Sequence, residues 1–234
     1  MRKNRAVFLG FAALSLGVCF APRSLAWEAK PAFYAQDDQL RSLKLDPPPA
    51  VGSETDRQDM AAIKDWQVKR TAHQCARAAA EAGHTGYDAF FGAISPFVQP
   101  MPSEVAQFFR HVQDDTYLSV GFLKTKYDRP RPFAQDSSVH PCIPAPNEKG
   151  YSYPSGHAAV ARVFALVLSD LAPERRAEFL ARADEVALDR VIGGVHHPTD
   201  VEAAKQLGNE IYAEFLKNQT FHADLEMARR FLKR

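Results

Sequence analysis

Apolar and polar residues along most of the chain recur with the spacing of amphipathic helices. One stripe has intervals of three, four or eight residues, which places its members on a single helix face: Val105, Phe109, Val112 and Val120. No stretch of the sequence alternates between apolar and polar residues over any length, as a half-buried strand does. The pattern therefore predicts an all-α fold.

Glycine and proline residues divide this pattern into separate helices. One long helix or two are expected over residues 54–82. The other predicted helices span 87–95, 103–127, 155–170, 173–192, 199–215 and 224–232. Thr199 and Glu202 predict a capping box at the start of one of them. Residues 27–53 are expected to form an extended arm, and residues 128–153 a long loop of the kind that often serves function.

The stretch from 151 to 170 contains a helix that is apolar on nearly every side, so it is expected to lie buried at the centre of a single-domain helical bundle. Its first turn carries Ser155, Gly156 and His157. The free N–H groups of a helix start suit an anion, and glycine lets backbone approach a ligand closely. Histidine gives or takes a proton near neutral pH. The first turn of this helix is therefore a candidate anion site.

The N-terminal residues have the pattern of a secretory signal peptide. Basic residues precede an apolar run from 6 to 21, which is short for a membrane span, and Ser24-Leu25-Ala26 offers small residues for signal peptidase. Cleavage is expected after Ala26, which leaves residues 27–234 as one all-α domain in the periplasm. No second long apolar span follows.

Charge and cysteine content narrow the function further. The sequence has 29 basic and 28 acidic residues, and loss of the four basic residues before position 27 gives a net charge of −3. Nucleic-acid binding is not expected, because it requires a basic excess. Cys75 and Cys142 remain after cleavage, and an oxidising compartment favours one intramolecular disulfide between them. Two free or intermolecular thiols are the alternative.

Three charged residues occupy positions where the helical pattern places an apolar residue: Lys124, Arg190 and Asp200. A buried charge is unfavourable unless it is paired or binds a ligand. With His157 and His196 nearby, these residues predict a functional site. His197 beside His196 could suggest a metal site with Asp200, but adjacent histidines point in different directions on a regular backbone. A metal site is not expected, because one of the histidines with Asp200 still lacks a third convergent ligand.

Together these residues form three motifs: Lys124-x6-Arg131-Pro132, Pro154-Ser155-Gly156-His157 and Arg190-x5-His196-x3-Asp200. The sequence thereby resembles the phosphatidic-acid-phosphatase type 2 (PAP2) superfamily, and most of all its class A bacterial non-specific acid phosphatases. Residues 45–53 also resemble the N-terminal region of that class. The resemblance implies the helical fold shared with vanadium haloperoxidases. Asp189 departs from the pattern, since the family usually has serine there; it either pairs with Arg190 or points away.

The resemblance implies a metal-independent, cofactor-free acid phosphatase that hydrolyses many small phosphate monoesters and is inhibited by phosphate or vanadate. His196 would attack phosphorus, and Asp200 would orient the His196 ring. His157 would protonate the leaving group, so an acidic pH optimum is expected. The phosphate would be bound by Lys124, Arg131, Ser155, Gly156 and Arg190. Arg129 is expected at the rim, and Tyr151 and Tyr153 either line the pocket mouth or pack.

Three other functions remain to be distinguished. A vanadium-dependent haloperoxidase uses the same anion site, but this chain is short for one. A membrane-lipid phosphatase should have several apolar spans. A non-catalytic phosphate-binding protein needs no histidine. The physiological substrate and a possible homo-oligomer are left open.

Overall fold

The computed structural model describes residues 32–83, 86–144 and 151–233, so the predicted signal peptide and the Ala26 cleavage site lie outside the described residues. Over these ranges the only strand-like pairing is an isolated antiparallel bridge between Phe97 and Leu232. The all-α prediction is confirmed. The helices are α1 (Asp37–Ser42), α2 (Glu54–Lys69), α3 (Ala72–Ala82), α4 (Tyr87–Phe91), α5 (Ser103–Tyr127), α6 (Pro132–Gln135), α7 (Gly156–Leu171), α8 (Arg176–Ile192), α9 (Pro198–Phe215) and α10 (Gln219–Arg229), with 3-10 turns at Gly92–Ile94 and Pro173–Arg175.

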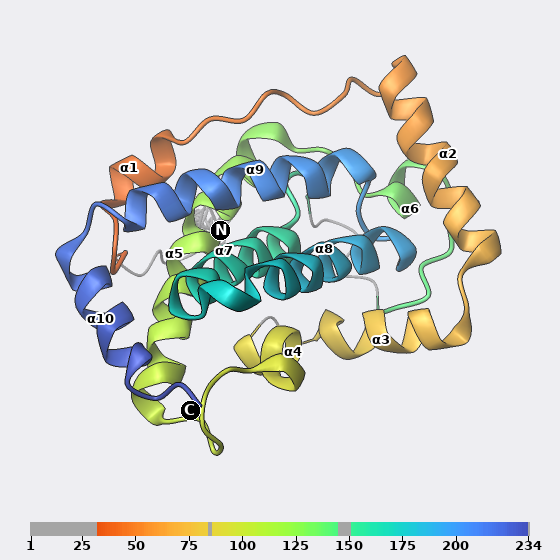
Figure 1. Cartoon of the computed structure of the whole chain (residues 1–234). Coiled ribbons are helices and arrows are strands. Elements are labelled where there is room, and N and C mark those ends of the chain that lie inside the picture. The colour runs from red at the N-terminus through yellow and green to blue at the C-terminus, as the bar shows by residue number, and fades with distance from the viewer. Residues whose placement is uncertain (1–31, 84–85, 145–150, 234) are drawn as a thin grey trace, which may run out of the picture.

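Helix α7 lies at the centre of the bundle, as its uniformly apolar sequence predicted. Thirteen of its sixteen residues are buried, so it has no solvent face. It packs most extensively against α8 and α9, and then against α5. Figure 1 shows α7 and α8 side by side through the middle of the molecule, with α9 along one side of the pair. The start of α7 is therefore surrounded by other helices and their connecting loops.

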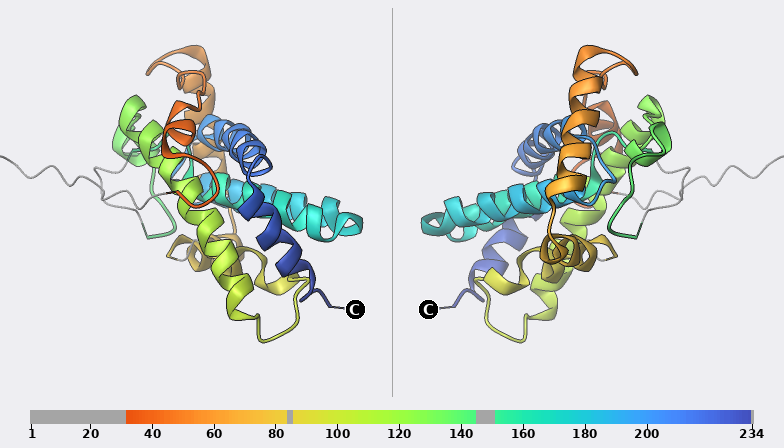
Figure 2. Two further views of the ribbon diagram at one scale, coloured as in Figure 1. Left: turned by 90° about the vertical axis from the view of Figure 1, so that its left-hand side faces the viewer. Right: turned by 90° about the vertical axis from the view of Figure 1, so that its right-hand side faces the viewer.

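The remaining helices enclose this centre from several directions. Helix α5 crosses the α7–α8 pair, whereas α2 and α3 flank α8 at the other side (Figures 1 and 2). The apolar stripe predicted for α5, Val105 to Val120, is buried. Aromatic residues fill the main core: Tyr34, Phe90, Phe91, Phe97, Phe108, Phe109, Phe164, Phe179, Phe215 and Phe221. Among the described helices, none is both long and apolar enough to cross a membrane.

Several helix boundaries differ from the prediction. The arm contains α1, and the long loop contains the short helix α6. The segment over 54–82 forms two helices, because Arg70 and Thr71 are extended and Thr71 caps α3. Helix α10 begins earlier than expected, at a cap formed by Asn218.

The capping box predicted from Thr199 and Glu202 is wrong. Helix α9 begins at Pro198, with His197 as its N-cap. Proline suits the first helical position, where its missing N–H group would have no partner. Asp200 is consequently the residue whose carboxylate accepts a hydrogen bond from the backbone N–H of His197, at 2.8 Å. The first turn of α9 thus fixes the Asp200 side chain.

Cys75 and Cys142 form a disulfide, as predicted, with their Cα atoms 5.7 Å apart. It joins α3 to the loop after α6. Beneath it Ala78, Ile143 and Val195 form a small second apolar cluster. The bridge therefore ties the loop against the connection between α8 and α9.

Candidate active site

Backbone hydrogen bonds bring the three sequence motifs together. The N–H of Ser152 donates to the carbonyl of Arg129 at 2.8 Å, and the N–H of Ser155 donates to the carbonyl of Asp200 at 3.0 Å. The end of the α5–α6 connection, the start of α7 and the start of α9 are thereby joined. Because main-chain atoms make these contacts, the side chains of all three motifs project from a fixed framework.

His196 lies in the tight connection between α8 and α9 and is almost completely buried. Its Nε2 is 3.1 Å from Nη1 of Arg131, and its Nδ1 is 3.4 Å from Oδ2 of Asp200. A guanidinium only donates hydrogen bonds, so Nε2 is the acceptor. The neutral ring then carries its proton on Nδ1, toward Asp200. This tautomer leaves a lone pair on Nε2.

The charges around His196 and Asp200 favour this assignment. Burial, followed by the charge of Arg131, lowers the pKa of His196 well below its ordinary value, and Asp200 offsets only part of the shift. Burial raises the pKa of Asp200, but hydrogen bonds with His196 and His197 outweigh it, so that pKa lies well below the usual range. A neutral imidazole thus faces an ionised carboxylate.

Three cations from three segments converge beside His196. Lys124 is in the last turn of α5, Arg131 immediately precedes α6, and Arg190 is in the last turn of α8. The Nζ of Lys124 donates to the carbonyl oxygens of Tyr151 and Ser152, at 2.7 and 3.1 Å. Its pKa falls to about 7, first through burial and then through the charge of Arg131. The pKa values of Arg131 and Arg190 fall to about 10, chiefly through burial.

Some buried donors in this cluster lack a partner. Nε and Nη1 of Arg190 and the hydroxyl of Ser155 form no hydrogen bond with any part of the chain that the structure describes. A buried unsatisfied donor is unfavourable by about 1–3 kcal/mol, and more when it is charged. Their arrangement at the start of α7, where helix N–H groups add partial positive charge, suits an anion with several oxygen atoms.

Gly156 has a packing role beside its position at the helix start. A Cβ atom there would lie 2.8 Å from Cε1 of Tyr117 and 3.6 Å from Cγ1 of Val120, both on α5. Glycine at position 156 therefore lets the start of α7 pack closely against α5. This role is separate from any close approach of a ligand to the backbone.

His157 follows in the first turn of α7, and its ring is half-buried near Phe90. Its Nε2 is 3.2 Å from the carbonyl oxygen of Glu81, which can only accept, so Nε2 carries a proton. Burial, and then the charges of Arg190, Arg131 and Lys124, lower the pKa of His157 to about 3. A bound anion would offset these positive charges and raise that pKa.

Asp189, the residue that departs from the family pattern, points toward α3. It is completely buried, and both its oxygens accept hydrogen bonds from Arg77: Oδ2 from Nε at 2.6 Å and Oδ1 from Nη2 at 2.7 Å. Glu185 also pairs with Arg77. The carboxylate thus stabilises the contact between α3 and α8.

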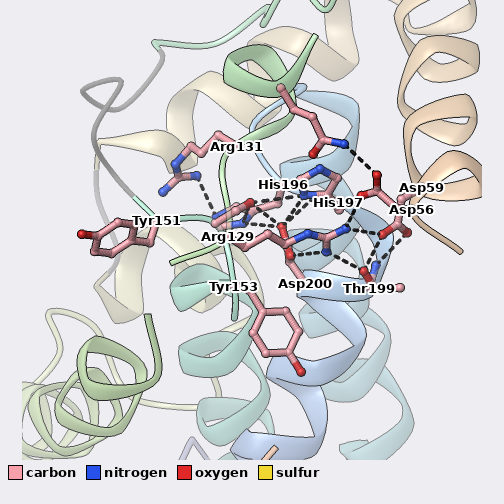
Figure 3. Close-up of polar contacts among 12 residues, drawn as sticks. Asp56, Asp59, Arg129, Arg131, Tyr151, Tyr153, His196, His197, Thr199 and Asp200 are labelled. Carbon is pink, nitrogen blue, oxygen red and sulfur yellow. Dashed lines mark hydrogen bonds and ion pairs between the residues drawn. The ribbon is translucent and has the colours of Figure 1, made fainter. Parts of the chain in front are cut away.

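Arg129 lies within the site although its sequence position did not indicate this. It was expected at the rim, but its side chain is 2% exposed. Figure 3 shows it extended between Asp200 and two carboxylates of α2, Asp56 and Asp59. It also donates to the hydroxyl of Thr199 at 2.7 Å. A polar loop surrounds Arg129 in the sequence, so periodicity gave no signal of burial.

Oδ2 of Asp200 has further neighbours. The hydroxyl of Ser152 donates to it at 2.5 Å, and Nδ1 of His197 lies 3.0 Å away. Tyr153 is buried and donates to the carbonyl of Asp46, whereas the ring of Tyr151 is partly exposed and points away from the cluster (Figure 3). Within the described ranges, no three His, Cys, Asp or Glu side chains are placed to hold a metal ion.

Comparisons with known proteins identify the relatives of this chain. Residues 115–209 match the model of the PAP2 superfamily, a range that contains all the predicted site residues. The chain is 32% identical to a non-specific acid phosphatase of Providencia stuartii, over 98% of this chain and 97% of that protein. It is 30% identical to a non-specific acid phosphatase of Salmonella typhi, over 82% of this chain and 78% of that protein.

Two crystal structures share the fold at low sequence identity. A bacterial vanadium-dependent iodoperoxidase superposes with a TM-score of 0.59 at 18% identity, covering 78% of this chain and 53% of that enzyme, so this chain spans about half its length. A transmembrane PAP2-type phosphatidylglycerolphosphate phosphatase from Bacillus subtilis gives a TM-score of 0.52 at 19% identity, covering 72% of this chain and 88% of that one. These two likenesses establish the architecture, and the identity to the Providencia stuartii protein extends over nearly the whole sequence. The chain therefore belongs to the PAP2 superfamily, among the bacterial non-specific acid phosphatases.

Proposed function

We propose that this chain is a secreted acid phosphatase that hydrolyses phosphate monoesters through a phosphohistidine at His196. One observation carries the proposal: buried, unpartnered donors of Arg190 and Ser155 lie in a cation cluster beside the lone pair of a neutral histidine. A phosphate monoester carries nearly two negative charges. Lys124, Arg131 and Arg190 offer three positive charges, and arginine suits bidentate contact with phosphate oxygens.

In the first step, Nε2 of His196 attacks phosphorus and forms the P–N bond as the ester P–O bond breaks. The leaving oxygen takes the bond's electron pair and a proton from His157, and departs as an alcohol. Asp200 stabilises the positive charge that develops on the His196 ring, as the carboxylate does in a catalytic triad. The three cations stabilise the transferring phosphoryl group, which is the main requirement of this reaction.

In the second step, water attacks the phosphohistidine while His157 accepts one of its protons. The P–N bond breaks, its electron pair returns to Nε2, and inorganic phosphate leaves. The cycle restores a protonated His157 and a neutral His196. Phosphate is therefore expected to inhibit as the product, and vanadate as a mimic of the five-coordinate phosphorus.

Substrate binding favours the protonated form of His157, which then takes its proton from solvent. Burial is the largest cause of the low pKa of His157, about 3, and the positive charges that lower it further belong to Arg190, Arg131 and Lys124, the cations that would bind phosphate. A bound dianion compensates those charges, so the pKa of His157 rises in the complex. An acidic optimum follows, because more complexes then have a protonated His157.

The proposal includes a broad substrate range, because the cluster recognises the phosphoryl group itself. It also includes activity without a divalent metal ion, since protein cations supply the charge. Periplasmic secretion rests on the N-terminal pattern up to Ala26. The names of the relatives support acid phosphatase activity and low specificity.

The proposal can be tested with purified protein and a panel of nucleotides, sugar phosphates and an aryl phosphate, with and without EDTA. Hydrolysis of several classes that survives EDTA is expected. Loss of activity with EDTA and its return with a divalent ion would contradict the mechanism. The haloperoxidase alternative predicts halide oxidation with vanadate and peroxide, and no turnover of phosphate esters.

A further inference from the structure

We infer that Arg129 is a positioning residue that acts through Asp200: it fixes the carboxylate that orients His196, without itself binding the substrate phosphate. The inference rests on the proposed function of His196 as the nucleophile. Arg129 is not one of the residues that define the three motifs: it lies in the variable segment between Lys124 and Arg131.

The first support is the division of labour between the two oxygens of Asp200. Oδ1 accepts a hydrogen bond from Nη1 of Arg129 at 2.7 Å. Oδ2 faces the histidines and Ser152, with Nδ1 of His196 at 3.4 Å. A carboxylate with one oxygen held in this way cannot rotate without losing a charge-assisted hydrogen bond in a buried site. Arg129 therefore sets the direction of the oxygen that faces His196.

The second support is that Arg129 is itself anchored. Its Nη2 donates to Asp59 at 2.9 Å and to Asp56 at 3.2 Å, two residues one turn apart on α2. Asp56 in turn accepts from the backbone N–H of Gly52 at 2.9 Å and from Gln135 at 2.8 Å. The guanidinium is therefore held at Nη1 by Asp200 and at Nη2 by the two carboxylates of α2.

The third support is a direct link from the α2 carboxylates to the first turn of α9. Asp59 accepts hydrogen bonds from the backbone N–H and the hydroxyl of Thr199, the residue before Asp200. Arg129 donates to that same hydroxyl. Helix α2 thus holds Asp200 in two ways: through Arg129, which contacts the Asp200 side chain, and through Thr199, whose backbone N–H donates to Asp59.

Charge explains why an arginine is required. Asp56, Asp59 and Asp200 are all buried, and the guanidinium lies among them. Its planar fork reaches the carboxylates on opposite sides at once. A lysine has the same charge but presents a single point, so it cannot keep all these contacts.

The test is the variant Arg129→Lys, assayed with an aryl phosphate for kcat and KM and with inorganic phosphate for its inhibition constant. We expect kcat to fall by about ten- to a hundredfold, by analogy with the scale found when a group that orients a metal-binding side chain is removed. KM and the inhibition constant of phosphate should stay within about twofold of the wild type, since Arg129 does not touch the phosphate.

Arg77→Lys is the matched control. Arg77 forms a bidentate pair with a buried carboxylate, Asp189, so the same substitution breaks the same kind of contact at a different place, between α3 and α8. A similar loss of thermal stability with nearly unchanged kcat is expected. Should Arg129→Lys fail to fold, Asp59→Asn weakens the anchor of Arg129 and should lower kcat with unchanged KM, to a smaller extent.

Several outcomes overturn the inference. Equal kcat in Arg129→Lys and Arg77→Lys would show that the contact is only structural, and unchanged kcat in Asp59→Asn would show the same of its anchor. A large rise in the inhibition constant of phosphate would show that Arg129 binds the anion directly. If the wild type has no phosphatase turnover, the proposed function fails and this inference with it; a fully active wild type with an equally active Arg129→Lys overturns this inference alone.

Discussion

Arg131 donates a hydrogen bond from Nη1 to Nε2 of His196, at 3.1 Å, and a second one to the carbonyl of Val195 at 2.7 Å. A cation assigned to phosphate binding therefore lies directly beside the nitrogen assigned to the attack. In the proposed mechanism, a phosphate oxygen would take the place of Nε2 as the acceptor of Arg131, and the lone pair of His196 would be released next to phosphorus. Substrate binding and activation of the nucleophile would then be one event.

The two histidines should differ in a trapping experiment. His196→Ala should abolish both turnover and phosphoenzyme with any substrate, because no atom remains to bond phosphorus. His157→Ala should still phosphorylate His196 when the leaving group is a nitrophenolate, which needs no proton, and then stall before hydrolysis. General acid–base catalysis contributes about 10²–10⁴-fold, which sets the size of the second defect. Rapid quench with radiolabelled substrate under alkaline conditions measures the intermediate. Phosphoenzyme in His196→Ala but not in His157→Ala would reverse the assigned roles.

Anion affinity should depend on the charge of Lys124. Burial and Arg131 lower its pKa to about 7, so it is charged below that pH and loses its charge above it. Sulfate keeps two negative charges from about pH 6 to 9, so its inhibition constant reports on the protein alone. That constant should rise up to about tenfold per pH unit above pH 7, as one proton is lost from the free site.

Lys124→Arg is the control for this titration, because a guanidinium stays charged throughout the range. Its sulfate inhibition constant should change much less with pH. A flat profile in the wild type would show that Lys124 does not lose its proton in this range.

Gly156→Ala tests the contact between α7 and α5. The new methyl group would meet the ring of Tyr117 at 2.8 Å, so the ring or the helix start must shift. Overpacking of this kind destabilises by about 1–3 kcal/mol. Urea unfolding should show the loss, and Tyr117→Leu should recover part of it in the double variant. If the effects of the two substitutions on the free energy of unfolding are strictly additive, contact with the Tyr117 ring is not the cause of the lost stability.

The disulfide between Cys75 and Cys142 should contribute substantially to stability. It closes a loop with a sequence separation of 67 residues, for which the chain-entropy model gives about 4 kcal/mol. Unfolding by urea with and without reductant measures the difference. Thiol titration of the unreduced, denatured protein should find no free thiol after the signal segment is removed. Two free thiols would contradict the bridge.

The sequence predicted best what depends on local pattern. The uniformly apolar α7 had to be central, and the charges at Lys124 and Arg190 stood out because they interrupted apolar stripes. Arg129 gave no such signal, since its partners Asp56 and Asp59 lie 73 and 70 residues away. Such pairing depends on how α2 packs, which periodicity does not report.

The start of α9 shows a different kind of error. Thr199 and Glu202 have the residue types of a capping box with Thr199 as the N-cap, but the N-cap is His197 and the helix starts at Pro198, two residues earlier. Two valid local signals competed, and the proline decided because its ring already has the helical φ angle. The open question about Asp189 also needed the structure, because its partner Arg77 is 112 residues away.

The anchoring of Arg129 on α2 has a consequence for how this protein can be divided. The match to the family model covers residues 115–209, whereas Asp56, Asp59, Arg77 and Cys75 all precede it. A recombinant fragment cut at the limits of that match would contain every motif residue, but Arg129 would lose two of its three carboxylate partners and Asp189 would lose Arg77. We therefore expect the autonomous folding unit to be larger than the segment that the family model matches, and we expect that grafting the three motifs onto another helical scaffold would require α2 and α3 as well.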